Sequence, residues 1–525
     1  MVAIQKKLNI KLVSIESGIS AIGFRKIAGI ARSIAPETEI CFIPTDNLYS
    51  FLSHIIPNSD SSIKSQDLTI IATYLSSADF IGFSSMTISA SFVEDLAIKI
   101  KKNNPKSFIF WGGVHPTLYS DIAIKHVDAI CIGEGEVPLQ MFMRGLKNGQ
   151  ILTNIPNMWF NVNNSIIKNK YLSLSTSDEL NALPHSYNQS DCVIYDLGKK
   201  IIRPFNKIDY TTFNGLLFRT IWTLGCPFSC SYCANDSFIK LNKEHRKLRR
   251  TSVDYIIDEI KQAQKSFPFI STIAFYDDNF IALPTDIIGE FCNKYKNEIN
   301  LPFVIFGMHP NIITKNKVEL LASAGMNRAR MGIQSGCEDT LKFYNRHTSI
   351  ERINTSSSIL ADAARKYKMI PPAYDIISDN PVETNRNIIE SLTLIYNLKR
   401  PFTLTVFSLR IFPQTQLFDY VKTNPKLVEY FKASSYLDTK KTINNVALYL
   451  LGIYKPPQFV FNRLINMVER ENGLTKEYKL LFYLVKILYL AIRGIDHVRK
   501  FDFSTIVGGW TYYVWKITSI RPRKK

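Results

Sequence analysis

The sequence predicts an α/β protein with two successive strand–helix domains and a helical segment at its carboxyl end. Short apolar runs that lack polar alternation recur along the chain, and such runs indicate strands buried on both faces. Amphipathic helical patterns lie between them, which is typical of a parallel sheet. Glycine, hydroxyl or carboxylate residues follow many of these runs. Because parallel sheets bind ligands at the carboxyl ends of their strands, these residues predict the site.

The first predicted domain covers residues 8–150 and has the pattern of a doubly wound, Rossmann-like sheet. Apolar residues at helical spacing occupy 24–34 and 92–101. A connector is expected over 151–212, with a hairpin around Asn163. The five predicted strands are residues 10–15, 39–43, 80–84, 108–111 and 129–132.

The second predicted domain covers residues 213–425. Six strand–helix units there predict a partial, TIM-like (β/α)6 barrel with its site at the carboxyl face of the strands. The six predicted strands are residues 216–224, 272–275, 303–306, 328–333, 374–377 and 403–409.

Residues 426–525 are expected to form a helical, aromatic-rich carboxyl-terminal domain. Their most apolar stretch, 480–492, is thirteen residues long and contains Lys486, so it is too short to span a bilayer. Two interpretations stay open, a helical cap over the active site and a surface that contacts a membrane or a lipid substrate. The pattern favours the cap. The basic residues 521–525 suit either interpretation.

Composition narrows the partners and the compartment. The 525-residue chain has 64 Lys and Arg against 45 Asp and Glu, a net charge of +19. This charge favours an anionic partner, and the last 75 residues alone carry a surplus of nine positive charges. Five of the eight cysteines are scattered, and residues 1–10 hold no apolar signal segment. We expect a cytoplasmic protein, with peripheral membrane contact possible, and nucleic acid is not an expected partner.

Three closely spaced cysteines, Cys226, Cys230 and Cys233, predict an iron–sulfur site. Three thiolates on one loop can hold three irons of a [4Fe–4S] cubane and leave the fourth iron open for a ligand. A structural zinc site would need paired Cys-x2-Cys knuckles or a Cys/His quartet. His245 follows twelve residues later, but it has no neighbouring partner ligand. The triplet therefore favours the cluster, in a reducing and anoxic environment.

The Cys-x3-Cys-x2-Cys spacing, with Tyr232 before the last cysteine, resembles the radical S-adenosylmethionine (SAM) enzymes. The resemblance implies that the open iron binds SAM. It also implies that one electron from a flavodoxin- or ferredoxin-type donor then yields a 5′-deoxyadenosyl radical. Later strand ends resemble this family's SAM-binding segments. The SAM-binding residues that the resemblance implies are Tyr232, Asp277, Asp278, Gln334, Ser335, Glu338, Asp379 and Glu383.

The first domain resembles the cobalamin-binding domain that precedes many radical SAM cores. The resemblance rests on the turns at 84–87, 112–117 ("GGVHPT") and 133–136 ("GEGE"). The loop at 14–23 lacks the histidine that would ligate cobalt from below, as in the radical SAM branch, and a degenerate domain without cobalamin stays open. The implied cobalamin-binding residues are Ser85, Thr87, Gly112, Gly113, His115, Gly133 and Glu134.

Together these resemblances imply a cobalamin-dependent radical SAM enzyme that methylates an unactivated carbon of a small-molecule or lipid substrate. One alternative keeps the radical but leads to coupling, cyclisation or rearrangement. Another is a non-catalytic iron–sulfur module that senses redox state. No residue is assigned as catalytic, and no motif identifies the substrate.

Overall fold

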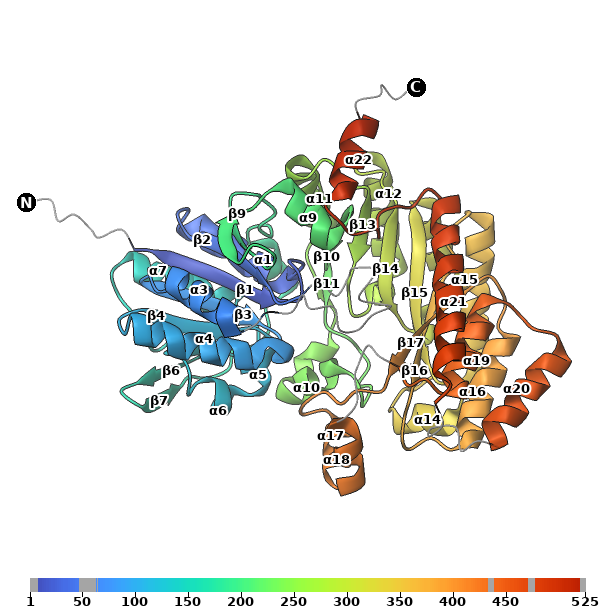
Figure 1. The fold of residues 1–525 in the computed structure, drawn as a ribbon. Coiled ribbons are helices and arrows are strands. Elements are labelled where there is room, and N and C mark those ends of the chain that lie inside the picture. The colour runs from blue at the N-terminus through green and yellow to red at the C-terminus, as the bar shows by residue number, and fades with distance from the viewer. Residues whose placement is uncertain (1–7, 47–62, 64, 433–438, 471–476, 520–525) are drawn as a thin grey trace, which may run out of the picture. The chain divides into compact units, whose positions relative to one another are not determined.

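A computed structural model describes residues 8–46, 63, 65–432, 439–470 and 477–519. These residues form two compact units, which are described separately (Figure 1). The first unit comprises the described residues of Met1–Phe218, Asp254–Ile270 and Ser504–Lys525, and the second those of Arg219–Val253 and Ser271–Phe503. The basic residues 521–525 lie outside the described ranges.

The first unit is built on a nine-stranded sheet of order β7-β6-β5-β4-β3-β1-β2-β8-β9. Its six central strands, β5 to β8 in that order, are parallel. The antiparallel hairpin of β6 and β7 extends one edge, and the antiparallel strand β9 extends the other. The strands are β1 (Ile10–Glu16), β2 (Glu39–Pro44), β3 (Phe80–Ser85), β4 (Phe108–Gly112), β5 (Ala129–Cys131), β6 (Met158–Val162), β7 (Ser165–Lys168), β8 (Val193–Asp196) and β9 (Ile201–Pro204).

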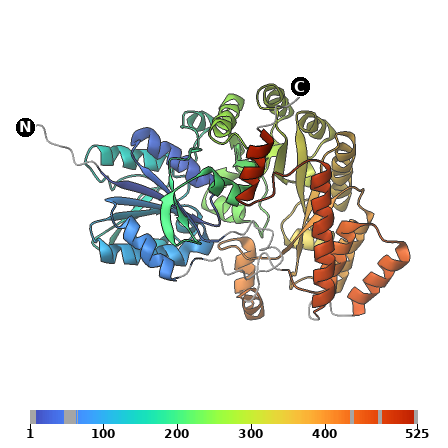
Figure 2. The same ribbon diagram turned by 45° about the horizontal axis from the view of Figure 1, so that its top comes forward.

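Helices cover both faces of this sheet (Figure 2). The helices α3 and α4 bury apolar residues against one face, and Trp111, fully buried on β4, belongs to that core. The segments are α1 (Ile22–Ile34), α3 (Ser65–Leu75), η1 (Thr87–Ser89), α4 (Ala90–Asn103), α5 (Val114–Leu118), α6 (Ser120–Ala123), α7 (Glu136–Lys147), α8 (Ser177–Asn181), α9 (Lys207–Asn214), α11 (Val253–Ser266) and α22 (Trp510–Ser519). The predicted doubly wound sheet is confirmed.

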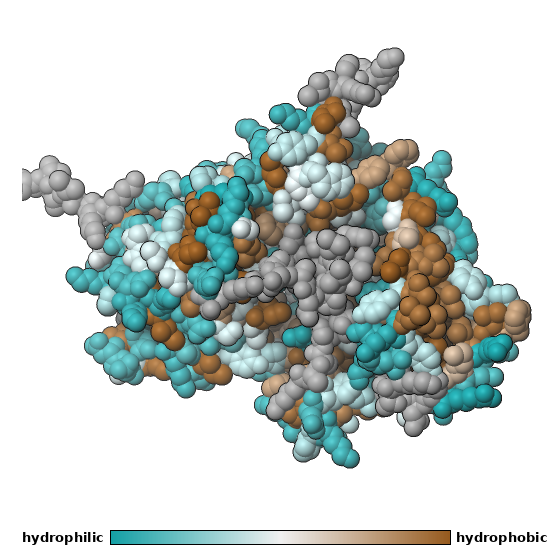
Figure 3. Space-filling model, in the orientation of Figure 1, coloured by the Kyte–Doolittle hydropathy of each residue, from teal (hydrophilic) through white to brown (hydrophobic). Residues whose placement is uncertain are grey.

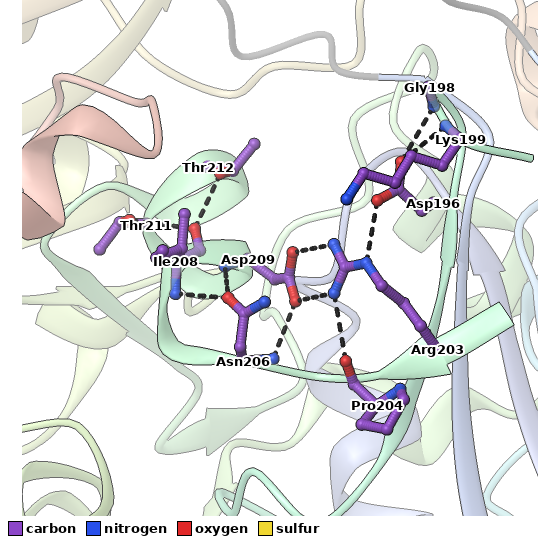
Figure 4. A network of polar contacts seen from close by, with 10 residues as sticks. All are labelled: Asp196, Gly198, Lys199, Arg203, Pro204, Asn206, Ile208, Asp209, Thr211 and Thr212. Carbon is purple, nitrogen blue, oxygen red and sulfur yellow. Dashed lines mark hydrogen bonds and ion pairs between the residues drawn. The ribbon is translucent and has the colours of Figure 1, made fainter. Parts of the chain in front are cut away.

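The predicted connector, 151–212, supplies four of the nine strands: β6 and β7 form a hairpin at the predicted position around Asn163, and β8 and β9 form a second hairpin that was not predicted. An ion-pair network holds the last hairpin to α9 (Figure 4). The Arg203 guanidinium donates to both carboxylate oxygens of Asp209 at 2.7 and 2.8 Å, and its Nε donates to Asp196 at 2.9 Å. Asn206 caps α9 in a reciprocal capping box with Asp209.

The second unit contains a six-stranded sheet of order β10-β13-β14-β15-β16-β17, in which the strands β13 to β17 pair in parallel. The strands are β10 (Leu217–Thr220), β13 (Thr272–Phe275), β14 (Phe303–Met308), β15 (Met326–Gln334), β16 (Ala373–Ser378) and β17 (Thr403–Ser408), with a small antiparallel ladder of β11 (Thr223–Leu224) and β12 (Arg249–Arg250). All six predicted strands are present, which confirms the open, partial barrel.

Helices of the second unit follow its strands in sequence. They are α10 (Ala234–Leu241), η2 (Lys243–Arg246), η3 (Phe280–Ala282), α12 (Thr285–Glu298), η4 (Pro310–Ile312), α13 (Lys315–Ser323), α14 (Glu338–Phe343), α15 (Ile350–Lys366), α16 (Asn385–Asn397), α17 (Gln416–Lys422), α18 (Pro425–Lys432), α19 (Ile443–Ile453), α20 (Gln458–Arg470) and α21 (Lys479–Arg499).

The carboxyl-terminal helices divide between the two units. Almost every residue of α19 is buried, and this helix packs against β17 and against α21. The last helix, α22, packs instead on α9 of the first unit. Among the residues that the structure describes, no helix is both long and apolar enough to cross a membrane.

Candidate functional site

The three cysteines occupy the loop between β11 and α10 of the second unit. Cys230 is buried, and Cys226 and Cys233 are half-buried. The Cys226 N–H donates to the His245 carbonyl at 3.0 Å, and the Cys233 N–H donates to the Cys230 carbonyl at 3.0 Å. Gly225 starts the loop with φ at +94°, and a Cβ there would lie 2.3 Å from the Lys247 carbonyl oxygen. The backbone therefore fixes the loop, and only glycine fits its first position.

A buried arginine holds the middle of this loop. Arg346 Nη1 lies 3.6 Å from the Cys230 sulfur and donates to the Tyr232 hydroxyl at 3.1 Å. Its Nη2 donates to the Gly332 carbonyl at the end region of β15. The Ser231 N–H donates to the Tyr344 carbonyl at 2.8 Å. The loop is thus tied to the barrel through side chain and backbone, and it presents its cysteines beside a positive charge.

The donor set of this loop fits a cubane cluster. Burial raises the pKa of Cys226 to about 11 and that of Cys233 to about 12, so the free thiols are protonated at neutral pH. Iron binding would deprotonate them. Within the described ranges, no group of three or more His, Cys, Asp or Glu is placed to hold a single metal ion. A cubane does not require such convergence, because each thiolate binds a different iron.

His309 is a site residue that the sequence analysis did not identify. It follows β14, and its ring stacks on Phe228 of the cysteine loop, with centroids 3.7 Å apart. Its Nδ1 accepts the Asn311 N–H at 3.2 Å, so the proton lies on Nε2, which has no hydrogen-bond partner in the described structure. Burial, then the nearby Arg346, lowers its pKa to about 2. His309 is a buried, neutral donor beside the loop.

The two carboxylates at the end of β13 differ in environment. Asp277 is buried, and its carboxylate accepts the N–H groups of Trp222 and Thr223 and the Thr223 hydroxyl. These bonds give Asp277 a structural role at the start of β11, in place of the predicted contact with SAM. Asp278 is accessible, although surrounding protein raises its pKa by desolvation. Of this predicted pair, Asp278 is the carboxylate that a ligand can reach.

A second group of polar residues gathers where β15 ends and α16 begins. Glu383 accepts from the Thr340 hydroxyl at 3.1 Å and from the Ser335 hydroxyl at 3.4 Å. Burial raises the pKa of Glu383 to about 7, despite these two bonds. Gln334 ends β15 with φ at +74°. The structure therefore brings Ser335 and Glu383 into hydrogen-bond contact, and Gln334 directly precedes Ser335.

Two other predicted SAM residues lie elsewhere. Glu338 is exposed in the first turn of α14, and no hydrogen bond links it to Glu383. The buried Asp379 carboxylate accepts from the Ser408 hydroxyl, the Lys440 N–H and the Asn445 side chain. Asp379 thus joins β16 to the start of α19. Its carboxylate is occupied by structural contacts, which is a correction to its predicted role.

The first unit carries its predicted residues at one edge of its sheet. Register pairs Ile15 with Ser85 and Ser84 with Gly112, so these strands end together. The Ser85 hydroxyl accepts the Trp111 indole N–H at 2.9 Å. Gly113 has φ at +104°, and a Cβ there would lie 2.8 Å from the Ser85 carbonyl oxygen. Backbone approaches closely at this edge, as a bound cofactor tail requires.

Thr117, which the sequence analysis did not select, links two of these turns. Its hydroxyl donates to the Gly113 carbonyl at 2.8 Å and accepts the Gly133 N–H at 3.0 Å. Met86 and Ile88 are exposed next to the same edge and give it an apolar surface. Accessible apolar side chains beside glycine turns suit a large, partly apolar cofactor such as cobalamin.

The remaining predicted residues of this edge have mixed placements. His115 is buried and stacks on Trp111 at 5.0 Å, and neither of its nitrogens has a hydrogen-bond partner among the described residues. Burial lowers its pKa. Thr87 begins η1 and is half-buried, and Glu134 accepts the Ser175 N–H at 2.9 Å. Thr87 is thus near the edge, whereas His115 lies in the core.

Comparisons with known proteins match both units. The Radical SAM superfamily matches residues 220–383, and the B12 binding domain matches residues 58–142. An uncharacterized methyltransferase of Pyrococcus horikoshii is 22% identical over 360 residues, which cover 67% of this chain and 71% of the relative. Two further relatives are matched over about half of their length. Bacteriochlorophyllide d C-8(2)-methyltransferase of Chlorobaculum tepidum is 23% identical, covering 51% of this chain and 52% of the relative. The anaerobic magnesium-protoporphyrin IX monomethyl ester cyclase of Synechocystis sp. is 25% identical, covering 50% of this chain and 49% of the relative.

Solved structures show the same fold. The cobalamin-dependent SAM radical enzyme OxsB, solved with aqua-cobalamin, has a TM-score of 0.59 at 14% identity and covers 97% of this chain and 84% of its own. The radical SAM methyltransferase TsrM of Kitasatospora setae has a TM-score of 0.58 at 12% identity and covers 79% of this chain and 75% of its own. The two domain matches show that the chain combines a B12-binding domain with a radical SAM domain, a combination that implies a [4Fe–4S] cluster, SAM and cobalamin as cofactors.

Proposed function

We propose that the chain is a cobalamin-dependent radical SAM methyltransferase that transfers a methyl group to an unactivated carbon. The observation that carries the proposal is the presence, in one chain, of a three-cysteine loop and a glycine-lined sheet edge, each within its own matched domain. Two relatives named as methyltransferases support the same activity. The substrate class, small molecule or lipid, is not defined by any of these observations.

The residues of the chain would bind and orient the reacting groups. When bound, the cluster and SAM supply a 5′-deoxyadenosyl radical, and cobalamin supplies the methyl group. Arg346 holds the loop through Cys230 and Tyr232, which fixes the positions of the thiolates. Asp278 is an accessible carboxylate suited to an ammonium group, and His309 offers a neutral N–H donor to a carboxylate. An electron donor of the flavodoxin or ferredoxin type belongs to the same proposal.

A second candidate is radical cyclisation or coupling without net methyl transfer. It is favoured by the similarity to the cyclase of Synechocystis, which covers 50% of this chain. Both candidates need SAM cleavage, and only the first needs the methyl group of SAM in the product. The origin of the new carbon atom therefore distinguishes the two.

The test uses the full chain, reconstituted anaerobically with iron, sulfide and cobalamin. The reconstituted chain is incubated with a strong reductant, trideuteromethyl-labelled SAM and a metabolite and lipid extract from a strain that lacks the protein. We expect 5′-deoxyadenosine and S-adenosylhomocysteine, together with an extract component that gains the labelled methyl group in mass spectra. Cys226→Ala should abolish 5′-deoxyadenosine.

Other outcomes decide against parts of the proposal. If a product forms together with 5′-deoxyadenosine but carries no labelled methyl group, the activity is cyclisation or coupling, and methyl transfer is rejected. No SAM cleavage by a fully loaded, reduced cluster rejects both candidates and leaves the redox module. Methyl transfer from SAM to added cob(I)alamin forms methylcobalamin, which absorbance can follow, so the methyl step is testable before the substrate is known.

A further inference from the structure

Helix α21 has one face packed on the second unit and an opposite face that is not packed. On the inner side, Phe482 and Tyr489 are buried, and their rings contact Tyr449 of α19 at 5.6 and 5.3 Å. The Tyr489 hydroxyl donates to the Leu404 carbonyl and accepts the Leu404 N–H at 2.9 Å. These contacts fix the rotation of the helix about its axis, and therefore fix which residues point outward.

The outward face forms a continuous apolar surface, here called the α21 stripe. Its residues recur at spacings of three and four, which places them on one side of a helix. Leu480 is the most accessible at 77%, and Figure 3 shows a hydrophobic band over this helix. Helix α21 spans 21 residues, or about 30 Å at 1.5 Å per residue. The stripe consists of Leu480, Leu481, Leu484, Ile487, Leu488, Ile495 and Val498.

Basic residues lie at the ends of the stripe. Lys479 is exposed at its beginning, where its ammonium pairs with Glu477 at 3.1 Å, and Arg499 and Lys500 are exposed at its end. Phe501 follows directly and is 84% exposed. Helix α21 contains four Lys or Arg residues and one acidic residue, Asp496. An exposed aromatic ring beside cations is typical of segments that bind the interface of an anionic bilayer.

The α21 stripe could be covered by a lipid bilayer or by a second copy of this chain, and the distribution of charge favours the bilayer. A helical seam between two copies normally carries charged residues along its flanks, which select the partner. The exposed stripe residues between Lys479 and Asp496 are all apolar. The chain also has a net charge of +19, so two copies repel each other, whereas an anionic lipid surface attracts each of them.

We propose that the α21 stripe lies flat in the interface of an anionic lipid bilayer and docks this protein on the membrane surface. The apolar side chains enter the acyl region, and the terminal cations contact lipid phosphates. The proposal concerns where the protein works and is independent of the methyltransferase reaction. It selects the membrane interpretation for α21, because the opposite face of this helix already forms its contact with the barrel.

Liposome flotation of the full chain tests the proposal. Vesicles of phosphatidylcholine with 30% phosphatidylglycerol are compared with vesicles of phosphatidylcholine alone, at low and at high salt. We expect the chain to float with the anionic vesicles, and to float less at high salt. Leu484→Glu/Leu488→Glu should lower partitioning on the order of tenfold, because each glutamate places a charge in the apolar face.

A matched control separates this effect from added charge. Ile98→Glu/Ile122→Glu makes the same change at two exposed apolar positions of the first unit and should float like the unchanged chain. Iron content and elution volume confirm that both variants fold. The proposal is overturned if the unchanged chain does not bind anionic vesicles, or if both variants bind equally. A dimer of the unchanged chain in sedimentation would also overturn the proposal, if the α21 variant is monomeric, the control variant stays dimeric and the unchanged chain does not bind vesicles.

Discussion

Arg346 places a permanent positive charge against the cysteine loop, and this residue gives the first prediction. Its guanidinium lies 3.6 Å from the Cys230 sulfur. A nearby cation stabilises the reduced, more negative state of a cluster. Arg346→Met should therefore lower the midpoint potential on the order of 100 mV, since a unit charge a few ångströms away contributes several kcal/mol at an effective dielectric of about 20. Potentiometric titration followed by EPR measures this shift.

Two further variants make this prediction specific. Arg346→Lys keeps the charge and should restore most of the potential. Arg352→Met removes a guanidinium that donates only to the Pro310, Asn311 and Ile313 carbonyls, so the potential should stay unchanged. Equal shifts in Arg352→Met and Arg346→Met would show that general loosening of the barrel is the cause.

Glu383 predicts a pH dependence of stability. Burial raises its pKa to about 7 in the folded chain, from 4.5. Because folding disfavours the charged form of Glu383, the contribution of this residue to folding stability is complete below pH 4.5 and is lost as the pH rises to 7. Glu383→Gln does not ionise. The stability of the Glu383→Gln variant, relative to that of the unchanged chain, should therefore increase by about 1–3 kcal/mol from pH 5 to pH 8.

Thermal unfolding midpoints at pH 5 and pH 8 measure this difference. Glu338→Gln is the matched control, because Glu338 is an exposed carboxyl near the same strand end. It should change the midpoint equally at both pH values. A Glu383→Gln midpoint that follows the unchanged chain across the whole range contradicts the burial argument.

At the scale of single residues, sequence identified positions better than roles. Ser335 and Glu383 follow different strands and lie in hydrogen-bond contact, because strand-end turns in parallel sheets converge. Asp277 and Asp379 also follow strands, yet they bind neighbouring backbone, and no local pattern separates these two uses of a carboxylate. Arg346 and His309 were not identified: His309 directly follows β14, whereas Arg346 lies beyond α14 and has no strand next to it in the sequence. Their burial arises from the tertiary fold.

At the scale of elements, the Arg203 network predicts a stability effect. Arg203 pairs with the nearly buried Asp209, which also caps α9. Arg203→Met leaves that carboxylate unpaired and should destabilise the first unit by about 2–3 kcal/mol, as expected when one partner of a partly buried pair is removed. Arg365→Met breaks an exposed pair with Asp362 and should cost less than about 1 kcal/mol. Urea unfolding compares the two variants.

Strand prediction succeeded where burial is complete and failed where it is partial. The five strands predicted for residues 8–150 are buried runs, and all five are present. The strands β8 and β9, of which only β9 lies at the edge, were not predicted because each is four residues long and partly exposed, so they carry little periodicity. Likewise, the apolar run at 480–492 does not show which face is buried. Only the contacts of Tyr489 decide that.

At the scale of the whole molecule, the residues predicted for each cofactor belong to one compact unit. The cysteine loop and its contacts belong to the second unit, and the edge formed by β3, β4 and β5 belongs to the first. Because binding energy for each group then comes from separate residues, loss of one group should leave the other bound. Replacing Cys226, Cys230 and Cys233 together by alanine should remove iron and leave cobalamin at its full stoichiometry.

The converse variant completes this prediction. Gly113→Val adds a branched side chain where even a Cβ would lie 2.8 Å from the Ser85 carbonyl oxygen, and it forces this residue out of a backbone conformation that favours glycine. It should abolish cobalamin binding and keep iron, with absorbance and metal analysis reporting each cofactor. If either variant loses both cofactors while its circular dichroism is unchanged, the two sites are coupled through the fold. The division into independently loaded units is then wrong.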